Sequence, residues 1–171
     1  MNKALSDKIE TNKKEYERLL KDDNYTNVRF NPKNGALSAI HKDHNFDPTI
    51  GKFGIPRGDY ELISLDVLYE YGNSIILESE RLGEGIKTPD GLLNDVLFDI
   101  KGIEGNSNRM IKDAISKASG QGAEIIVLYF HDKNMFDRNI VENGYNKYLD
   151  NSKSKRIQKV YSIVDGYLYR I

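Results

Sequence analysis

The sequence predicts an α/β protein with a mixed central sheet flanked by helices, preceded by an N-terminal helix and hairpin. Segments with helical and with strand periodicity alternate along the chain, which is the element order of α/β folds. Residues 125–130 are apolar on both faces and therefore predict a buried central strand. Two short turn sequences, Asn94-Asp95 and Asp165-Gly166, separate apolar segments and predict antiparallel neighbours in the same sheet.

The N-terminal part of the chain predicts an attachment to this core. Residues 4–21 carry apolar side chains at helical spacing among Lys and Glu, which indicates an amphipathic helix. Residues 28–30 and 36–40 flank a connection with Pro and Asn-Gly, which favours a hairpin. Residues 41–58 hold two prolines and three glycines, so we expect either an ordered loop or the boundary between an N-terminal attachment and the main domain. We therefore assign residues 1–57 to the attachment.

Residues 58–171 predict the α/β core with its C-terminal hairpin. The dense apolar stripe after Gly58 is helical and ends at Gly72, a typical C-cap residue. The expected elements are then a helix over 60–69, strands over 75–77, 91–93 and 96–101, a helix over 108–119, the central strand, a helix over 135–149 and a closing hairpin over 157–171.

The charge balance and the lack of cysteine exclude several classes of protein. The chain has 171 residues, with 25 Lys and Arg against 26 Asp and Glu, and a formal net charge of -1. This balance fits neither a uniformly basic nucleic-acid coat nor an acidic disordered chain, so a site for a polyanion must be local. The absence of cysteine excludes a disulfide scaffold, a thiol nucleophile and a cysteine-ligated zinc. No apolar run approaches the roughly 20 residues that span a bilayer, so we expect no membrane partner.

The expected hairpin around Asn94-Asp95 concentrates charged groups on one spot. A two-residue turn there places Asp90 opposite Asp99, where like charges are destabilising unless a cation joins them. The two-residue period of a strand puts Lys101 on the same face as Asp99. The backbone carbonyl of Ile100 adds a further hard oxygen. Oxygen ligands of this kind suit Mg²⁺ or Mn²⁺.

A plainer interpretation of the same residues stays open. Asp90 can simply start a turn, and Asp99 with Lys101 can be an ordinary pair that faces solvent. The functional interpretation gains weight because this strand is otherwise apolar and an apolar helix follows it, an environment in which unpaired polar groups are costly.

These residues resemble the core of the PD-(D/E)xK nucleases. Pro89-Asp90, eight residues and Asp99-Ile100-Lys101 form the acidic hairpin of that pattern, and Glu61 stands where its helical Glu would stand. The resemblance is closest to the C-terminal tRNase domains of contact-dependent growth-inhibition toxins, in which the following helix ends in Gln, here Gln121. It covers about residues 58–131 and implies a restriction-endonuclease-like core. Asp99 replaces the more usual Glu, and Gly102 stands where such toxins often carry Ser or Thr.

The resemblance implies metal-assisted hydrolysis of phosphodiesters. Asp90 and Asp99, with Glu61 directly or through water, would hold one or two divalent cations, Mg²⁺ first and Mn²⁺ or Zn²⁺ as alternatives. Lys101 would position the attacking water or stabilise the charge that develops on the phosphate. Gln121 is either a member of this site or a residue of the helix-end loop.

The same resemblance implies a biological setting. It is that of a bacterial toxin effector that acts on nucleic acid in a competing cell, with tRNA favoured over DNA. A cognate immunity protein is then the expected partner. The site of action would be the cytoplasm, after delivery from a donor cell as part of a larger toxin.

Two other groups of residues are candidates for binding. Lys153, Lys155 and Arg156 belong to the main basic concentration and predict contact with a phosphate backbone, although such a run is often just a solvated linker. His41 and His44 form an H-x-x-H pair, which can ligate zinc, but without a third partner nearby in the sequence we expect surface loop residues.

Two rival functions stay open from the sequence. One is a nuclease of DNA repair, recombination or a mobile element with the same site. The other is a non-catalytic nucleic-acid-binding or capsid-associated module, in which the Asp and Lys residues form only a surface charge network.

Overall fold

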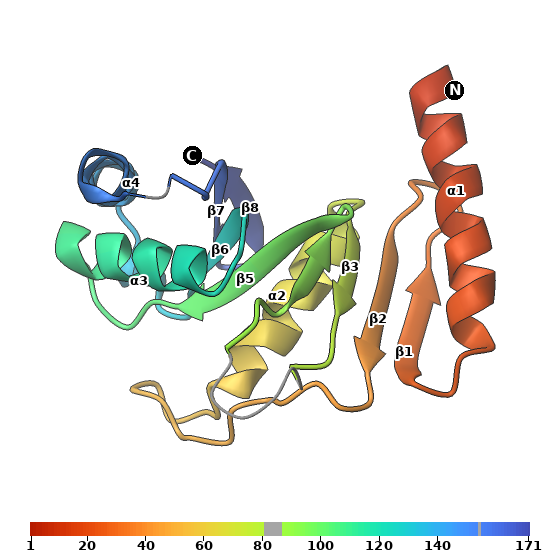
Figure 1. Cartoon of the computed structure of the whole chain (residues 1–171), viewed down its shortest axis with the longest axis horizontal. Helices are drawn as coiled ribbons and strands as arrows, with labels where there is room; N and C mark the ends of the chain where they lie inside the picture. The colour runs from red at the N-terminus through yellow and green to blue at the C-terminus, as the bar shows by residue number, and fades with distance from the viewer. Residues whose placement is uncertain (81–86, 154) are drawn as a thin grey trace.

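The computed structural model describes residues 1–80, 87–153 and 155–171 and confirms the predicted α/β class (Figure 1). In chain order its elements are α1 (Lys3–Leu20), β1 (Tyr25–Phe30), β2 (Leu37–His41), α2 (Gly58–Glu70), β3 (Ser74–Leu77), β4 (Gly91–Leu93), β5 (Val96–Gly102), α3 (Asn108–Gly120), β6 (Ile125–Phe130), the 3₁₀ helix η1 (Lys133–Met135), α4 (Arg138–Asn151), β7 (Lys159–Val164) and β8 (Tyr167–Arg170). The eight strands of this described part form one sheet, in the order β1 to β8.

The sheet is mixed, as predicted, because it contains both parallel and antiparallel neighbours. β2 is parallel to β3, β5 to β6 and β6 to β7. These three connections contain α2, α3 and α4, since parallel neighbours need a crossover. The remaining neighbours are antiparallel.

Helices cover both faces of the sheet. Side chains of α2 pack with one face, whereas those of α3 and α4 pack with the other. Alternate residues of β6 belong to the two cores, with Val127 on the α2 side and Leu128 on the opposite side. The prediction of a buried central strand is therefore confirmed.

The N-terminal hairpin continues the same sheet. β1 and β2 are antiparallel, and β2 forms a parallel ladder with β3. α1 packs on this hairpin, at the end of the molecule opposite α3 and α4 (Figure 1). One sheet thus contains strands from both sides of residue 57. A division of the chain into two domains at that residue stays a prediction. Residues 42–57 form the connecting loop, with one isolated bridge between Ile50 and Pro56.

The helix expected over 135–149 is wrong at its start. A short 3₁₀ helix ends at Met135, and α4 begins only at Arg138. Asp137 explains the break, because its side chain accepts hydrogen bonds from the N–H groups of Asn139 and Ile140 and so caps α4. No helix in the described part of the chain has the length and apolar character that a membrane crossing requires.

Candidate functional site

The hairpin of β4 and β5 brings Asp90 toward Asp99. Asn94 and Asp95 have φ values of 49° and 67°, as a two-residue type I′ turn requires. The ladder has the expected register, with the pairs Leu93–Val96, Leu92–Leu97 and Gly91–Phe98. The turn therefore fixes which residues meet beyond the end of β4.

Gly91 is required because β4 passes very close to β3. A Cβ atom on Gly91 would lie 1.9 Å from the carbonyl oxygen of Ile76, so no larger residue fits without a shift of the backbone. The glycine that follows Asp90 thus allows this carboxylate to stand at the junction of three strands.

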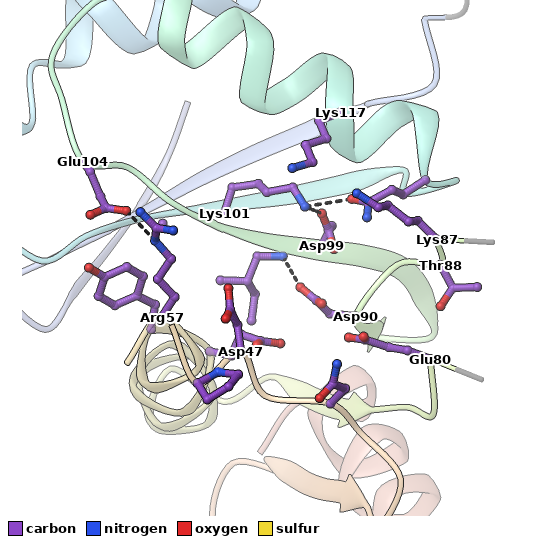
Figure 2. Close-up of a pocket in the computed structure, with 17 residues that line it drawn as sticks. Asp47, Arg57, Glu80, Lys87, Thr88, Asp90, Asp99, Lys101, Glu104 and Lys117 are labelled. Atoms are coloured by element: carbon purple, nitrogen blue, oxygen red, sulfur yellow. Dashed lines mark hydrogen bonds and ion pairs between the residues drawn. The ribbon is translucent and has the colours of Figure 1, made fainter. Parts of the chain in front are cut away.

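One edge of β5 is free at Ile100, because β4 has already ended. Ile100 pairs only with Val127 of β6. Its N–H donates to Oδ2 of Asp90 at 2.6 Å in place of a ladder partner (Figure 2). In a strand the N–H and C=O groups of one residue point to the same side, so the Ile100 carbonyl faces the same space. Ile100 accordingly lines the pocket described below.

Asp99, Lys101 and Gln121 are in direct contact. The ammonium nitrogen of Lys101 lies 2.5 Å from Oδ2 of Asp99 and donates to Oε1 of Gln121 at 2.7 Å (Figure 2). Gln121 is the C-cap residue of α3, so the C-terminal end of this helix supplies the acceptor for the Lys101 ammonium group. The side chain of Asp99 is only 1% exposed, against 20% for Lys101.

Glu61 reaches the same pocket from α2, which covers the opposite face of the sheet. Its Oε1 lies 2.9 Å from Nε2 of His44, whose Nδ1 lies 2.7 Å from the carbonyl oxygen of Glu78. The His44 side chain is fully buried and packs edge-on against Phe46. The expectation of surface histidines is therefore wrong for His44, because the loop after β2 folds back onto α2. His41 is half-buried at the end of β2.

Glu80, shortly after β3, completes a compact group of possible ligands. One ligand atom from each of His44, Glu61, Glu80 and Asp90 lies within 4.8 Å of the others. Asp90 belongs both to this group and to the contact with Ile100. Carboxylates from α2, from the end of β3 and from the β4–β5 hairpin therefore converge.

Burial is the main reason that the pKa of Asp90 is raised well above its usual value, and the negative charges of Asp99 and Glu61 raise it further. Burial also raises the pKa of Glu80, where the repulsion from Glu61 and Asp99 opposes the attraction of His44. For His44, burial disfavours the charged form, but the contact with Glu61 outweighs it and the pKa is raised. The group therefore carries more negative charge than its surroundings stabilise.

The carboxylates of this group, together with Asp99, Ile100, Lys101 and Gln121, line one pocket of about 680 Å³, whereas His44 lines an adjoining pocket that Glu80 shares. At the far end of the first pocket Arg57 donates from Nε to Oε1 of Glu104 at 2.8 Å (Figure 2). Lys87 and Lys117 also line it, near Asp99 (Figure 2). Within residues 1–80, 87–153 and 155–171, neither of these two lysines forms an ion pair.

The predicted basic patch lies outside this pocket. Lys153, Lys155 and Arg156 are exposed and do not line it. The Arg156 guanidinium approaches Gly122, the residue after Gln121. The basic segment therefore borders the site at the end of α3.

Sequence reasoning missed Lys87, Lys117 and Glu80, which line the pocket, and misplaced His44, which contacts Glu61. Lys117 had a usable signal, because it lies four positions before Gln121 and thus on the same face of α3. Glu80 had a weaker signal, its place just beyond the carboxyl end of β3. His44 had only the H-x-x-H spacing with His41, which did not point to Glu61, because His44 reaches the site through the packing of an irregular loop.

The donor set fits a divalent cation. Carboxylate oxygens from Glu61, Asp90 and Asp99 and the carbonyl of Ile100 are the hard ligands that Mg²⁺ or Mn²⁺ accepts. The structural observation that supports this fit is the cluster around Asp90, in which ligand atoms of Glu61, Glu80 and His44 lie within 4.8 Å of one another and of an Asp90 oxygen.

The fold and the site together define the class of this protein. It is an α/β protein in which two aspartates and a lysine meet at the free edge of a strand. Residues 87–166 match the family model of the contact-dependent growth inhibition CdiA C-terminal domain, and this segment is just under half of the chain. That part of the chain, which contains Asp90, Asp99, Lys101 and Gln121, is thus similar to the C-terminal toxin domains of contact-dependent growth inhibition. No curated protein and no solved structure gave a significant match.

Proposed function

We propose that this protein is a metal-dependent endonuclease of the PD-(D/E)xK type that hydrolyses phosphodiester bonds. The observation that carries the proposal is the convergence of Asp90, Asp99 and Lys101 at the free edge of β5. The buried carboxylates need a cation, and the pocket beside them is large enough for a nucleotide.

Each residue has a role in this proposal. Asp90, Asp99, Glu61 and the Ile100 carbonyl hold the divalent cation, Mg²⁺ first and Mn²⁺ or Zn²⁺ as alternatives. Such a cation, when bound, polarises the scissile phosphate and lowers the pKa of bound water. Lys101 orients the attacking water and stabilises negative charge on the phosphate. Gln121 holds the Lys101 ammonium in place through the hydrogen bond at 2.7 Å.

The substrate in this proposal is nucleic acid, with tRNA ahead of DNA. The pocket carries Lys87 and Lys117 beside Asp99, positioned for phosphates next to the cleaved bond. Lys153, Lys155 and Arg156 extend the basic surface past the end of α3. Phosphate contacts from such side chains supply affinity without sequence specificity.

The biological role in this proposal is that of a toxin effector domain, supported by the match of residues 87–166. The domain would be delivered as part of a larger toxin and act in the cytoplasm of a competing cell. A cognate immunity protein would protect the producer.

The decisive experiment incubates purified protein with total tRNA and, separately, with plasmid DNA, each with Mg²⁺ and with EDTA. We expect cleavage of tRNA that EDTA stops and that Mg²⁺ or Mn²⁺ restores. Cleavage of the plasmid instead would favour a nuclease of DNA repair or of a mobile element. Binding without any cleavage of either would favour a non-catalytic module and contradict the proposal.

A second experiment tests the biological role. Expression of the chain in a bacterium should arrest growth, and co-expression of the neighbouring open reading frame should restore it. Growth at the normal rate, with active enzyme present in the cells, would contradict the toxin assignment.

A further inference from the structure

The His44 ring is held in one orientation by a backbone carbonyl. Its Nδ1 lies 2.7 Å from the carbonyl oxygen of Glu78, and a carbonyl oxygen can only accept a hydrogen bond. Nδ1 therefore carries a proton. The 2.9 Å contact between Nε2 and the Glu61 carboxylate needs a second proton between those atoms, and a cation bound at Nε2 would take the place of that proton. Histidines that bind metals usually donate their other ring N–H to a carbonyl or carboxylate in this way.

Nε2 of His44 points at carboxylates. It lies 2.9 Å from Oε1 of Glu61, and one ligand atom each from His44, Glu61, Glu80 and Asp90 lies within 4.8 Å of the others. Ligands about 2.0–2.2 Å from a common ion lie about 3 Å apart when adjacent and slightly more than 4 Å apart when opposite. Small side-chain rotations therefore bring all four atoms around one ion.

The charge of this group also calls for a cation. Glu61, Glu80 and Asp90 carry three carboxylates, and the side chains of Glu61 and Glu80 are only 13% and 29% exposed. In the described part of the chain the ion pairs of these three carboxylates are those of His44 with Glu61 at 2.9 Å and with Glu80 at 3.8 Å, so one imidazole at most faces three carboxylates. A buried group of this charge is costly unless a cation compensates it.

We propose that His44 is a metal ligand, and that its Nε2 binds one divalent cation together with the carboxylates of Glu61, Glu80 and Asp90. An imidazole among three carboxylates suits Mn²⁺ or Zn²⁺ better than Mg²⁺, which prefers oxygen ligands alone. This inference deepens the proposed function, since it names a ligand of the same carboxylate group. It also makes the loop of residues 42–57, which lies outside the matched segment, a part of the metal site.

The test uses Mn²⁺ with the full chain at about pH 8, where most imidazoles are neutral. Pulsed electron paramagnetic resonance of bound Mn²⁺ detects nitrogen ligands directly, and titration gives the affinity. We expect a nitrogen coupling in the wild type that is lost in His44→Gln, together with an affinity at least about tenfold lower. His41→Gln and His131→Gln are matched controls, since His41 contacts the backbone N–H of Asp43 and His131 contacts Tyr129.

If His44→Gln does not fold, the controls still decide the matter. The chain has three histidines, so a nitrogen coupling that persists in both controls belongs to His44. Bound Mn²⁺ without nitrogen coupling would overturn the inference, even if His44→Gln lowered the affinity, because His44 would then only position Glu61. Nitrogen coupling without nuclease activity would support the inference and contradict the proposed function, whereas cleavage without nitrogen coupling would do the reverse.

Discussion

Two carboxylates in the same pocket, Glu104 and Asp90, have opposite electrostatic environments. Burial works against ionisation of Glu104, but hydrogen bonds from the Lys52 N–H and the Arg57 guanidinium outweigh it and lower its pKa. Burial raises the pKa of Asp90, and the charges of Asp99 and Glu61 raise it further. Within the described residues, Glu104 thus has a counter-ion in Arg57, whereas Asp90 has no ion pair with a lysine or arginine.

The difference separates a contact whose charges are balanced by partners in the chain from a group of carboxylates that repel one another. The Glu104 group ties the loop of residues 42–57 to the end of β5 with partners that the chain supplies. The Asp90 group is held in place by backbone packing around Gly91 and Ile100 even though its charges repel one another. A fold that maintains such repulsion is typical of functional sites.

The largest expected effect follows the loss of a carboxylate at the Asp90 end of the pocket. Asp99→Asn keeps the shape of the side chain but removes its charge, so cleavage of nucleic acid should fall by about 10²-fold or more. Initial rates at saturating substrate measure the effect, and circular dichroism should show an unchanged fold. Asp95→Asn, in the exposed turn, is the control and should cleave normally. A wild-type rate in Asp99→Asn would contradict the mechanism.

The next effect is stabilisation by a metal. A cation that binds only the folded chain adds about 2.7 kcal/mol at 100 times its dissociation constant, which should raise the Tm by about 5–10 °C relative to EDTA. Differential scanning calorimetry measures this shift. The shift should largely disappear in Asp90→Asn and persist in Glu104→Gln. An equal shift in both variants would show that the two ends of the pocket do not differ as described.

The pH dependence of the metal-free protein sharpens the same comparison. Because the pKa of Asp90 is higher in the folded than in the unfolded chain, the folded state binds more protons between those two values. The wild type should therefore lose stability relative to Asp90→Asn as the pH rises from about 4 through the raised pKa, and the difference between the two should stop changing below about pH 4. Urea unfolding in EDTA at a series of pH values measures the difference. A constant difference would mean that Asp90 titrates normally.

A smaller effect is expected from the cations on the rim of the pocket. Lys117→Gln, made in the cleavage-deficient Asp99→Asn protein, should weaken tRNA binding severalfold and reduce the slope of log affinity against log salt by about 0.7–0.9. Lys153→Gln should have a similar effect if the exposed basic segment also contacts phosphates. Lys112→Gln is the matched control, since Lys112 is on the same helix and pairs with Asp113. Fluorescence anisotropy at several salt concentrations distinguishes these variants.

The smallest effect concerns the structural end of the pocket. Glu104→Ala removes the acceptor of the Lys52 N–H and the partner of Arg57, so amide exchange around Lys52 should accelerate with little change in Tm. Hydrogen exchange measures it, with Glu10→Ala on exposed α1 as the control. Unchanged exchange at Lys52 would show that Glu104 does not restrain the loop.

Much of the site could be predicted from the sequence, because local rules determine it. The Asn94-Asp95 turn sets the hairpin register, and the two-residue strand period puts Asp99 and Lys101 on one face. The helix that follows delivers Gln121 to Lys101. These relations involve neighbouring elements, so sequence spacing translates directly into distance.

Other parts of the site could not be predicted, because they depend on packing between distant segments. Sequence spacing cannot show that the loop after β2 folds back on α2 and buries His44 against Glu61. The break at Asp137 was also missed. The helical spacing of apolar residues continues through this position, so the spacing alone does not reveal that the Asp137 side chain caps a new helix.

The sequence by itself determined the α/β class, the acidic hairpin and the shared face of Asp99 and Lys101, since turn chemistry and strand periodicity act over a few residues. Only the tertiary structure decided that α2, the chain just after β3 and an irregular loop bring Glu61, Glu80 and His44 together beside the free edge of β5. Those contacts join segments far apart in the chain. They are fixed by the fit of the whole core, which no local pattern encodes.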